Sequence, residues 1–124
     1  MKQIFISLLI ALCFTCCSTQ KQVSAPLKGR LEIKGACAHY VIKILSGKAG
    51  GLKAEKTWTN PSDGKIYTNV FTVQNYCSFP ADIKEGEEFY FEWLTEPPAQ
   101  NCMRCMIFVP TPETQNAIKV QPHH

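Results

Sequence analysis

Residues 27–45, LKGRLEIKGACAHYVIKIL, decide the fold of this chain. In the first half of the stretch, Leu31 and Ile33 alternate with charged side chains, which is the period-two pattern of a half-buried strand. In the second half, residues 38–45 are rich in β-branched and apolar side chains and favour a second strand. A glycine and an alanine mark the bend between them. The stretch therefore predicts two consecutive strands, at 27–34 and 38–45.

The same signals predict four more short strands along the chain, at 66–73, 88–94, 105–109 and 117–120. A dense turn signal, NPSDG at 60–64, precedes the first of these. Two prolines, Pro110 and Pro112, separate the last two, because proline cannot sit inside a central strand. Residues 50–57 tolerate a helix, and a short one is expected there.

Six short strands with turns between them predict an all-β fold, a small closed or partly open barrel, with a β-sandwich as the alternative. Hydrophobic residues make up 45% of the chain, so residues 27–124 are expected to form one domain with one core. The bend near Gly35 and the turn at 84–87, just before an aromatic strand, resemble OB-like barrels. This resemblance covers roughly residues 27–120 and implies architecture rather than chemistry.

The N-terminus has the pattern of an export signal. Met1, Lys2 and Gln3 form a short positive start, and residues 4–14 are apolar apart from Ser7. The apolar run is far shorter than the roughly 20 residues that span a bilayer as a helix. Residues 1–17 are therefore interpreted as a signal peptide.

The cleavage region is similar to that of bacterial lipoproteins. Residues 14–17, FTCC, best fit the lipoprotein pattern, which makes Cys17 the acylated residue. Ordinary signal peptidase cleavage after Ser18 is the alternative and would give a soluble periplasmic or secreted protein. Residues 18–26 are polar, end in proline and are expected to form a tether.

The whole chain resembles small exported bacterial lipoproteins that carry one β domain and have no assigned activity. The resemblance rests on the signal, the acylation site at Cys17 and the single β-rich region of residues 27–124. It implies a membrane-anchored protein of the cell envelope, held through an N-terminal lipid.

Four cysteines remain after the cleavage region, and an even number in an oxidising compartment predicts two disulfides. They are Cys37, Cys77, Cys102 and Cys105. Sequence permits three connectivities, of which Cys37 with Cys77 and Cys102 with Cys105 is favoured.

The C-x-x-C pair of residues 102–105 also allows a thiol-redox or metal-handling role, since Met103 and Met106 add soft sulfur atoms. A redox motif usually opens a helix, however, and this one is followed by a strand-like run. A zinc site would need a second C-x-x-C pair, whereas Cys37 and Cys77 each stand alone. A structural role is therefore favoured, with no metal, cofactor or catalytic residue expected.

Charge differs between the halves of the domain. Residues 20–65 carry a net charge of +6, and residues 66–124 carry −4. The basic half is interpreted as a solvated surface, and an exported protein meets little nucleic acid, so no nucleic-acid partner is expected.

Aromatic side chains offer the remaining candidates for a binding surface. Phe89, Phe91 and Trp93 share one strand face and are expected to pack inward, leaving Tyr90 outward. Trp58 is expected in a loop. Trp58 and Tyr90 are therefore the candidate ligand-surface residues of a non-catalytic binding or structural module, whose partner is an envelope protein or a glycan.

Overall fold

The protein is described by a computed structural model that covers residues 26–103 and 105–122. Its six strands are β1 (Leu27–Gly35), β2 (His39–Ser46), β3 (Glu55–Thr59), β4 (Ile66–Val73), β5 (Glu88–Leu94) and β6 (Gln115–Val120). Within those ranges the only helical element is one 3-10 turn, η1 (Tyr76–Ser78). The predicted all-β class is confirmed. The predicted signal peptide, with Cys17, and all but the last residue of the tether lie outside the described residues.

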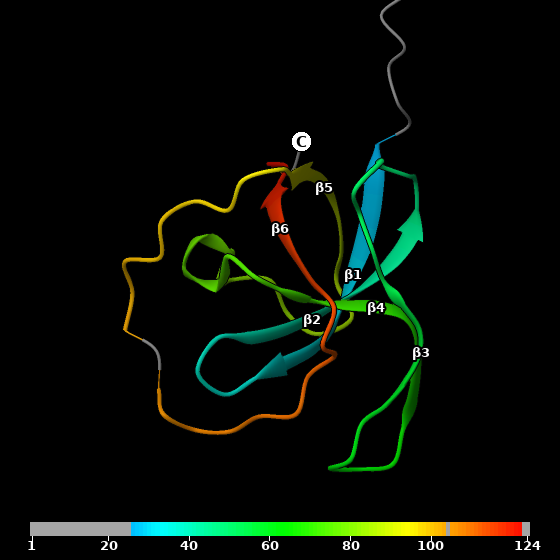
Figure 1. The fold of residues 1–124 in the computed structure, drawn as a ribbon, viewed down its shortest axis with the longest axis vertical. Coiled ribbons are helices and arrows are strands. Elements are labelled where there is room, and N and C mark those ends of the chain that lie inside the picture. The colour runs from blue at the N-terminus through cyan, green and yellow to red at the C-terminus, as the bar shows by residue number, and fades with distance from the viewer. Residues whose placement is uncertain (1–25, 104, 123–124) are drawn as a thin grey trace, which may run out of the picture.

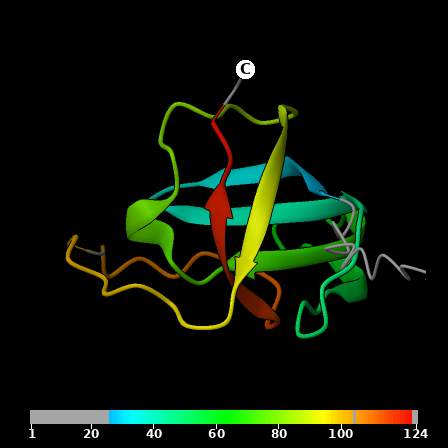
Figure 2. The same cartoon turned by 90° about the horizontal axis from the view of Figure 1, so that it is seen from above.

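Five of the strands close into a ring. The strands hydrogen-bond in the order β2-β1-β5-β6-β4-β3, and a further pairing between β2 and β4 completes the circle (Figure 1). β3 lies outside the ring and extends β4. β4 and β6 pair in parallel, whereas the other pairings are antiparallel. In Figure 2, β5 and β6 run across the direction of β1, β2 and β4. Closure leaves the ring strands few unpaired edges.

β1 can pair with both β2 and β5 because its backbone is irregular. It pairs with β2 along most of its length and with β5 over its first four residues, with register shifts between Lys28 and Gly29 and between Leu31 and Ile33. Such shifts bend a strand and increase its twist. At Gly29 a side chain would meet Ile42 Cγ2 at 2.9 Å, so the close approach of β1 and β2 requires glycine there.

The core fills the inside of the ring. Its largest fully buried apolar side chains are Phe71, Leu31 and Ile42. The prediction for β5 is confirmed at three positions, because Phe89 and Phe91 are buried and Tyr90 is exposed. The remaining core members come from β1, β2, β4 and β6 and from the segment between η1 and β5, and they are Leu27, Tyr40, Val41, Val70, Val73, Phe79, Ile83, Ala117 and Ile118.

Two predicted elements are wrong. Residues 50–57 contain no helix, because from Glu55 onward the chain pairs with β4 as β3. The strand expected at 105–109 is also absent, and this stretch belongs to a long loop between β5 and β6. A disulfide ties Cys105 to the β1–β2 turn, and Ile107 and Phe108 are both exposed instead of alternating as they would on a strand with one buried face.

Candidate functional site

Two disulfides join three loops at one end of the ring. Cys37, in the turn between β1 and β2, is bonded to Cys105, and Cys77, in η1, is bonded to Cys102. Both bonds have a Cα–Cα distance of 5.5 Å. The prediction that these four cysteines form two disulfides is confirmed, but the favoured pairing is wrong.

The reason for the pairing is the closure of the ring. The β1–β2 turn and η1 are distant in sequence from the β5–β6 loop, yet they lie beside it at the left of Figure 1. Cys102 and Cys105 lie close together in the sequence, but Cys102 is bonded to Cys77 in η1 and Cys105 is bonded to Cys37 in the β1–β2 turn. The backbone N–H of Cys102 also donates a hydrogen bond to Cys77 Sγ, at 3.3 Å. Residue spacing alone could not reveal this arrangement.

Hydrogen bonds fix both stems of the long β5–β6 loop. On the first stem, the Cys77 N–H donates to the Gln100 side-chain oxygen, at 2.9 Å. On the second stem, the buried hydroxyl of Thr72 donates to the Pro112 carbonyl at 2.7 Å, and the Thr72 N–H donates to the Thr114 carbonyl at 2.9 Å. The loop therefore starts and ends at fixed positions on the ring.

Between these stems the loop exposes large apolar side chains. We call residues 102–108 the apolar loop, within which residue 104 is not described. The exposed fractions are 100% for Met103, 103% for Met106, 57% for Ile107 and 88% for Phe108. Solvent-exposed large apolar side chains gathered in one place mark an interaction surface more often than isolated ones do.

The other exposed large apolar side chains of the described residues are isolated. They are Ile66, on β4, and Tyr90, on β5. Sequence reasoning missed the apolar loop because it assigned Ile107 and Phe108 to a strand and considered Met103 and Met106 only as metal ligands. The usable signal was the run of apolar residues around two cysteines, bounded on both sides by prolines.

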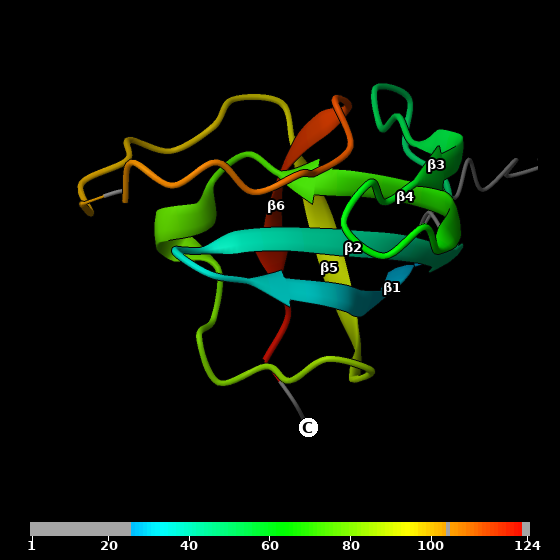
Figure 3. The ribbon, with the colours of Figure 1, turned by 90° about the horizontal axis from the view of Figure 1, so that it is seen from below.

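The apolar loop lies far from the point where the domain begins. In Figures 1 and 3 the β5–β6 loop and the β1–β2 turn occupy the left side, and β1 begins on the right. Because residues 18–26 precede β1, any anchor on that side is joined to the opposite end of the domain.

Trp58 and Tyr90, the two predicted ligand-surface residues, are not brought together. Trp58 lies on β3, not in a loop, and its ring packs against Tyr67 with centroids 5.6 Å apart. Tyr90 lies on β5, under the Lys28 ammonium at 5.7 Å from the ring centroid. β3 and β5 are separated by two strands in the sheet order. Their role in binding stays a prediction.

A polar groove of 340 Å³ lies on the outer surface of the ring, beside the Trp58–Tyr67 pair. Among its lining residues are Arg30, Lys43 and Tyr67. Both of these basic side chains have partners. Arg30 Nε lies 2.6 Å from Glu32 Oε1, and Lys43 Nζ donates a hydrogen bond to the Thr68 hydroxyl. Desolvation raises the pKa of Tyr67, with smaller contributions from Asp63, Glu32 and Glu85.

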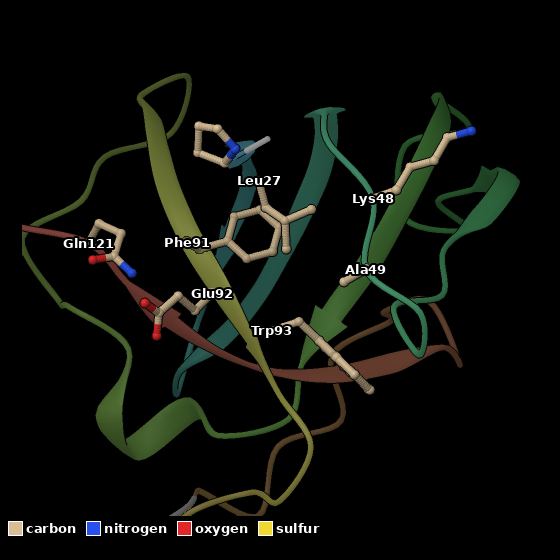
Figure 4. Close-up of a pocket in the computed structure, with 8 residues that line it drawn as sticks. Leu27, Lys48, Ala49, Phe91, Glu92, Trp93 and Gln121 are labelled. Atoms are coloured by element: carbon tan, nitrogen blue, oxygen red, sulfur yellow. The ribbon is translucent and has the colours of Figure 1, made fainter. Parts of the chain in front are cut away.

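Two further hollows lie at the end where β1 begins. The larger, of 480 Å³, is lined by Leu27, Phe91 and Trp93 together with the segment that carries Lys48 and Ala49 (Figure 4). Pro26 and Gln121 line both this hollow and the neighbouring one of 440 Å³, which also includes Tyr90. Each is lined by apolar side chains together with two charged ones, Lys48 and Glu92 in the larger hollow and Lys28 and Glu88 in the smaller.

The Cys102 and Cys105 sulfur atoms are not joined to one another, so the C-x-x-C pair does not form a disulfide of its own. Among the described residues, no group of three or more His, Cys, Asp or Glu side chains is placed to hold a metal ion. His39, the first residue of β2, is buried, and its Nδ1 lies 2.8 Å from the Ala36 carbonyl oxygen in the preceding turn.

Two disulfides suggest an oxidising, exported environment. No helix in the described ranges is both long and apolar enough to cross a membrane. Comparisons with protein-family models, with curated proteins and with solved structures find no match to this chain. The case for a function therefore rests on the residues and their geometry.

Proposed function

We propose that this protein is a membrane-anchored lipoprotein of the cell envelope, a non-catalytic binding module built on an OB-like barrel. One observation carries the proposal. The Cys37–Cys105 disulfide joins the β1–β2 turn to the β5–β6 loop, so the loops at one end of the ring form a single fixed surface. A fixed surface loses less conformational entropy when it binds a partner.

The order of the ring strands supports the OB-like barrel. Without β3, the chain contributes five strands to the ring, and its loops between the first two and the last two strands meet at one end. OB-fold domains are five-stranded Greek-key barrels that contact ligands through these two loops. By this analogy, the disulfide-bonded end is the binding end.

The N-terminal sequence supports export and anchoring. The signal-like sequence at 1–17 places Cys17 at the cleavage point, and the two disulfides fit an oxidising compartment. Acylation at Cys17 would leave the tether and the start of β1 nearest to the membrane. The binding end would then face away from it.

The alternative, a thiol-redox or metal-handling protein that uses Cys102 and Cys105, gains no specific support. In the structure each of these cysteines is already bonded to a cysteine of another loop. A binding role does not require either disulfide to be reduced.

Intact-mass analysis of the protein purified from the envelope of an exporting bacterium tests the proposal. We expect an added diacyl or triacyl mass on a chain that begins at Cys17, and four thiols that react with alkylating agent only after reduction. A Cys17→Ala variant is the matched control and should lack the added mass. An unacylated wild-type chain that begins near Thr19 would make the protein soluble, and four thiols reactive without reduction would support the alternative.

A further inference from the structure

We propose that this chain reaches its native disulfides by thiol–disulfide exchange with an envelope protein that carries a reactive dithiol, that is, with a disulfide isomerase. The inference rests on the export part of the proposed function, because it needs an oxidising compartment, but not on the anchor or the binding end. It is carried by the nested pairing of the cysteines, by their number and by the contacts of Cys77.

The pairing of the four cysteines is nested. One bond, Cys77–Cys102, spans 25 residues and lies inside the span of the other, which covers 68. Closing a loop costs more entropy as the loop becomes longer. In the unfolded chain Cys102 therefore meets Cys105 more readily than Cys77, because only two residues separate the pair. Cys37 likewise closes a shorter loop with Cys77 than with Cys105. Oxidation before folding favours these two non-native bonds.

The native bonds depend on the closed ring. Cys37 lies in the turn between β1 and β2, and Cys105 lies in the loop before β6. The two meet because β6 pairs with β4 and β5 and so closes the ring (Figure 1). In the chain-entropy model, two such bonds contribute a stabilisation comparable to the total stability of a domain of this size. We therefore expect the reduced ring to be too unstable to direct the first oxidation.

The number of cysteines leaves no thiol to correct a wrong pairing. Residues 18–124 contain four cysteines, and Cys17 would carry the lipid on its sulfur atom. Once the four are joined in two non-native bonds, the chain holds no free thiolate. Disulfides exchange through attack by a thiolate, so an external nucleophile is required. A bacterial envelope is kept oxidising kinetically and not by a thiol buffer, which favours a protein dithiol that is kept reduced.

Three exchanges convert the non-native bonds into the native ones. The isomerase thiolate attacks Cys37 Sγ, which breaks the Cys37–Cys77 bond, forms a mixed disulfide and releases the Cys77 thiolate. This thiolate attacks Cys102 Sγ, which forms the Cys77–Cys102 bond and releases the Cys105 thiolate. The Cys105 thiolate then attacks Cys37 Sγ, which forms the second native bond and releases the isomerase thiolate. Two disulfides are present before and after, so no oxidant is consumed.

The contacts of Cys77 support this order of events. Its sulfur accepts a hydrogen bond from the Cys102 N–H at 3.3 Å, and its own N–H donates to the Gln100 side-chain oxygen at 2.9 Å. These bonds hold η1 beside the first stem of the β5–β6 loop. A hydrogen bond to a thiolate also stabilises the charged form. The Cys77–Cys102 bond, which has the shorter span, therefore forms before the bond that closes the β1–β2 turn onto the loop.

Oxidation of the purified protein after full reduction tests the proposal. The reduced chain is treated with diamide in native buffer, the diamide is removed, and the bonds are identified as linked tryptic peptides. Trypsin cleaves after Arg104 and so separates Cys102 from Cys105. We expect the non-native pairing to be the main product and to persist. Addition of reduced disulfide isomerase in catalytic amount should then make the native pairing the main product.

Cys105→Ser is the matched variant, because it leaves an odd number of cysteines. One thiolate is then always free to start the exchange, so we expect the Cys77–Cys102 bond to form without any isomerase. The same linkages are measured after export in bacterial hosts with and without their disulfide isomerase. The native fraction of the wild-type chain should fall in the host without it, whereas Cys105→Ser should form its bond equally in both.

Three results would overturn the inference. They are native pairing as the main product of oxidation without isomerase, equal native fractions of the wild-type chain in both hosts, and equal conversion by the same amount of reduced glutathione. The last result would assign the exchange to a small thiol and not to a protein. An acylated protein that reaches its native bonds in the host without isomerase contradicts this inference alone. A soluble, unacylated protein whose native bonds require the isomerase contradicts the proposed anchoring alone.

Discussion

Cys37 is bonded to Cys105 across a sequence separation of 68 residues, which fixes the β1–β2 turn against the long β5–β6 loop. Cys37 and the next residue, Ala38, both have positive φ angles, 60° and 63°. Two consecutive residues in this region form the tight turn that suits the twist of a β-hairpin. The disulfide and the turn therefore both fix the position of Cys37 at this end of the ring.

Tryptic digestion without reduction should reveal this connectivity directly. Trypsin cleaves after Arg104 and so separates Cys102 from Cys105. We expect peptide 35–43 to be linked to 105–119, and peptide 66–84 to be linked to 85–104. The pairing favoured by the sequence would instead link 35–43 to 66–84 and 85–104 to 105–119. Mass spectrometry before and after reduction distinguishes the two results.

Both disulfides should stabilise the domain substantially. In the chain-entropy model, a separation of 68 residues corresponds to about 4 kcal/mol, and one of 25 residues corresponds to about 3.5 kcal/mol. We therefore expect the double variants Cys37→Ser with Cys105→Ser, and Cys77→Ser with Cys102→Ser, to lose similar amounts of unfolding free energy. Denaturant titration measures the loss. A loss well below about 2 kcal/mol without the Cys77–Cys102 disulfide would contradict the prediction that both disulfides stabilise the domain substantially.

The period-two pattern predicted the ring strands well where one face is buried. β1, β2, β4 and β5 lie within one or two residues of their predicted bounds. Prediction failed where contacts outside the segment decide the structure. β3 is a strand because β4 lies beside it, although its residues tolerate a helix, and residues 105–109 form a loop although their side chains favour a strand.

The candidate binding surface was predicted only in part. The four bonded cysteines could be found from their even number and the export signal, but not their pairing, since the ring brings Cys102 and Cys105 to different loops. Tyr90 was correctly expected to point outward because alternation along β5 determines its direction. The exposure of Phe108 was not predicted, since residues 105–109 were assigned to a strand and large apolar side chains are most often buried.

Gly51 should be intolerant of any side chain, and its neighbour provides the control. A Cβ at Gly51 would lie 2.0 Å from Trp93 Cη2, so Gly51→Ala must displace the indole and should lower the unfolding free energy by about 1–3 kcal/mol. At Gly50 nothing lies within 4 Å, and Gly50→Ala should change stability little. Denaturation followed by tryptophan fluorescence measures both effects. Equal stability of the two variants would contradict the predicted contact.

Asn75 should be the most important polar side chain of the core. It is buried after β4, and its amide accepts a hydrogen bond from the Ile118 N–H at 2.8 Å and donates to the Ile118 carbonyl at 2.7 Å. A second donation, to the Ser78 hydroxyl, fixes η1, and so this one amide connects β6 to the turn that carries Cys77.

Asn75→Ala would leave both Ile118 backbone groups buried without these partners. Each such group costs about 1–3 kcal/mol, so we expect a loss of unfolding free energy of about 2–5 kcal/mol. Ser78→Ala removes one of the three amide bonds, together with the donation of the Ser78 hydroxyl to the Asn75 carbonyl, and should cost about 1 kcal/mol, while Asn101→Ala, at an exposed position, should cost little. Amide exchange at Ile118 adds a local measure, because its protection should fall in Asn75→Ala even where the domain stays folded. If Asn75→Ala and Asn101→Ala were equally stable, the amide would not connect β6 to η1.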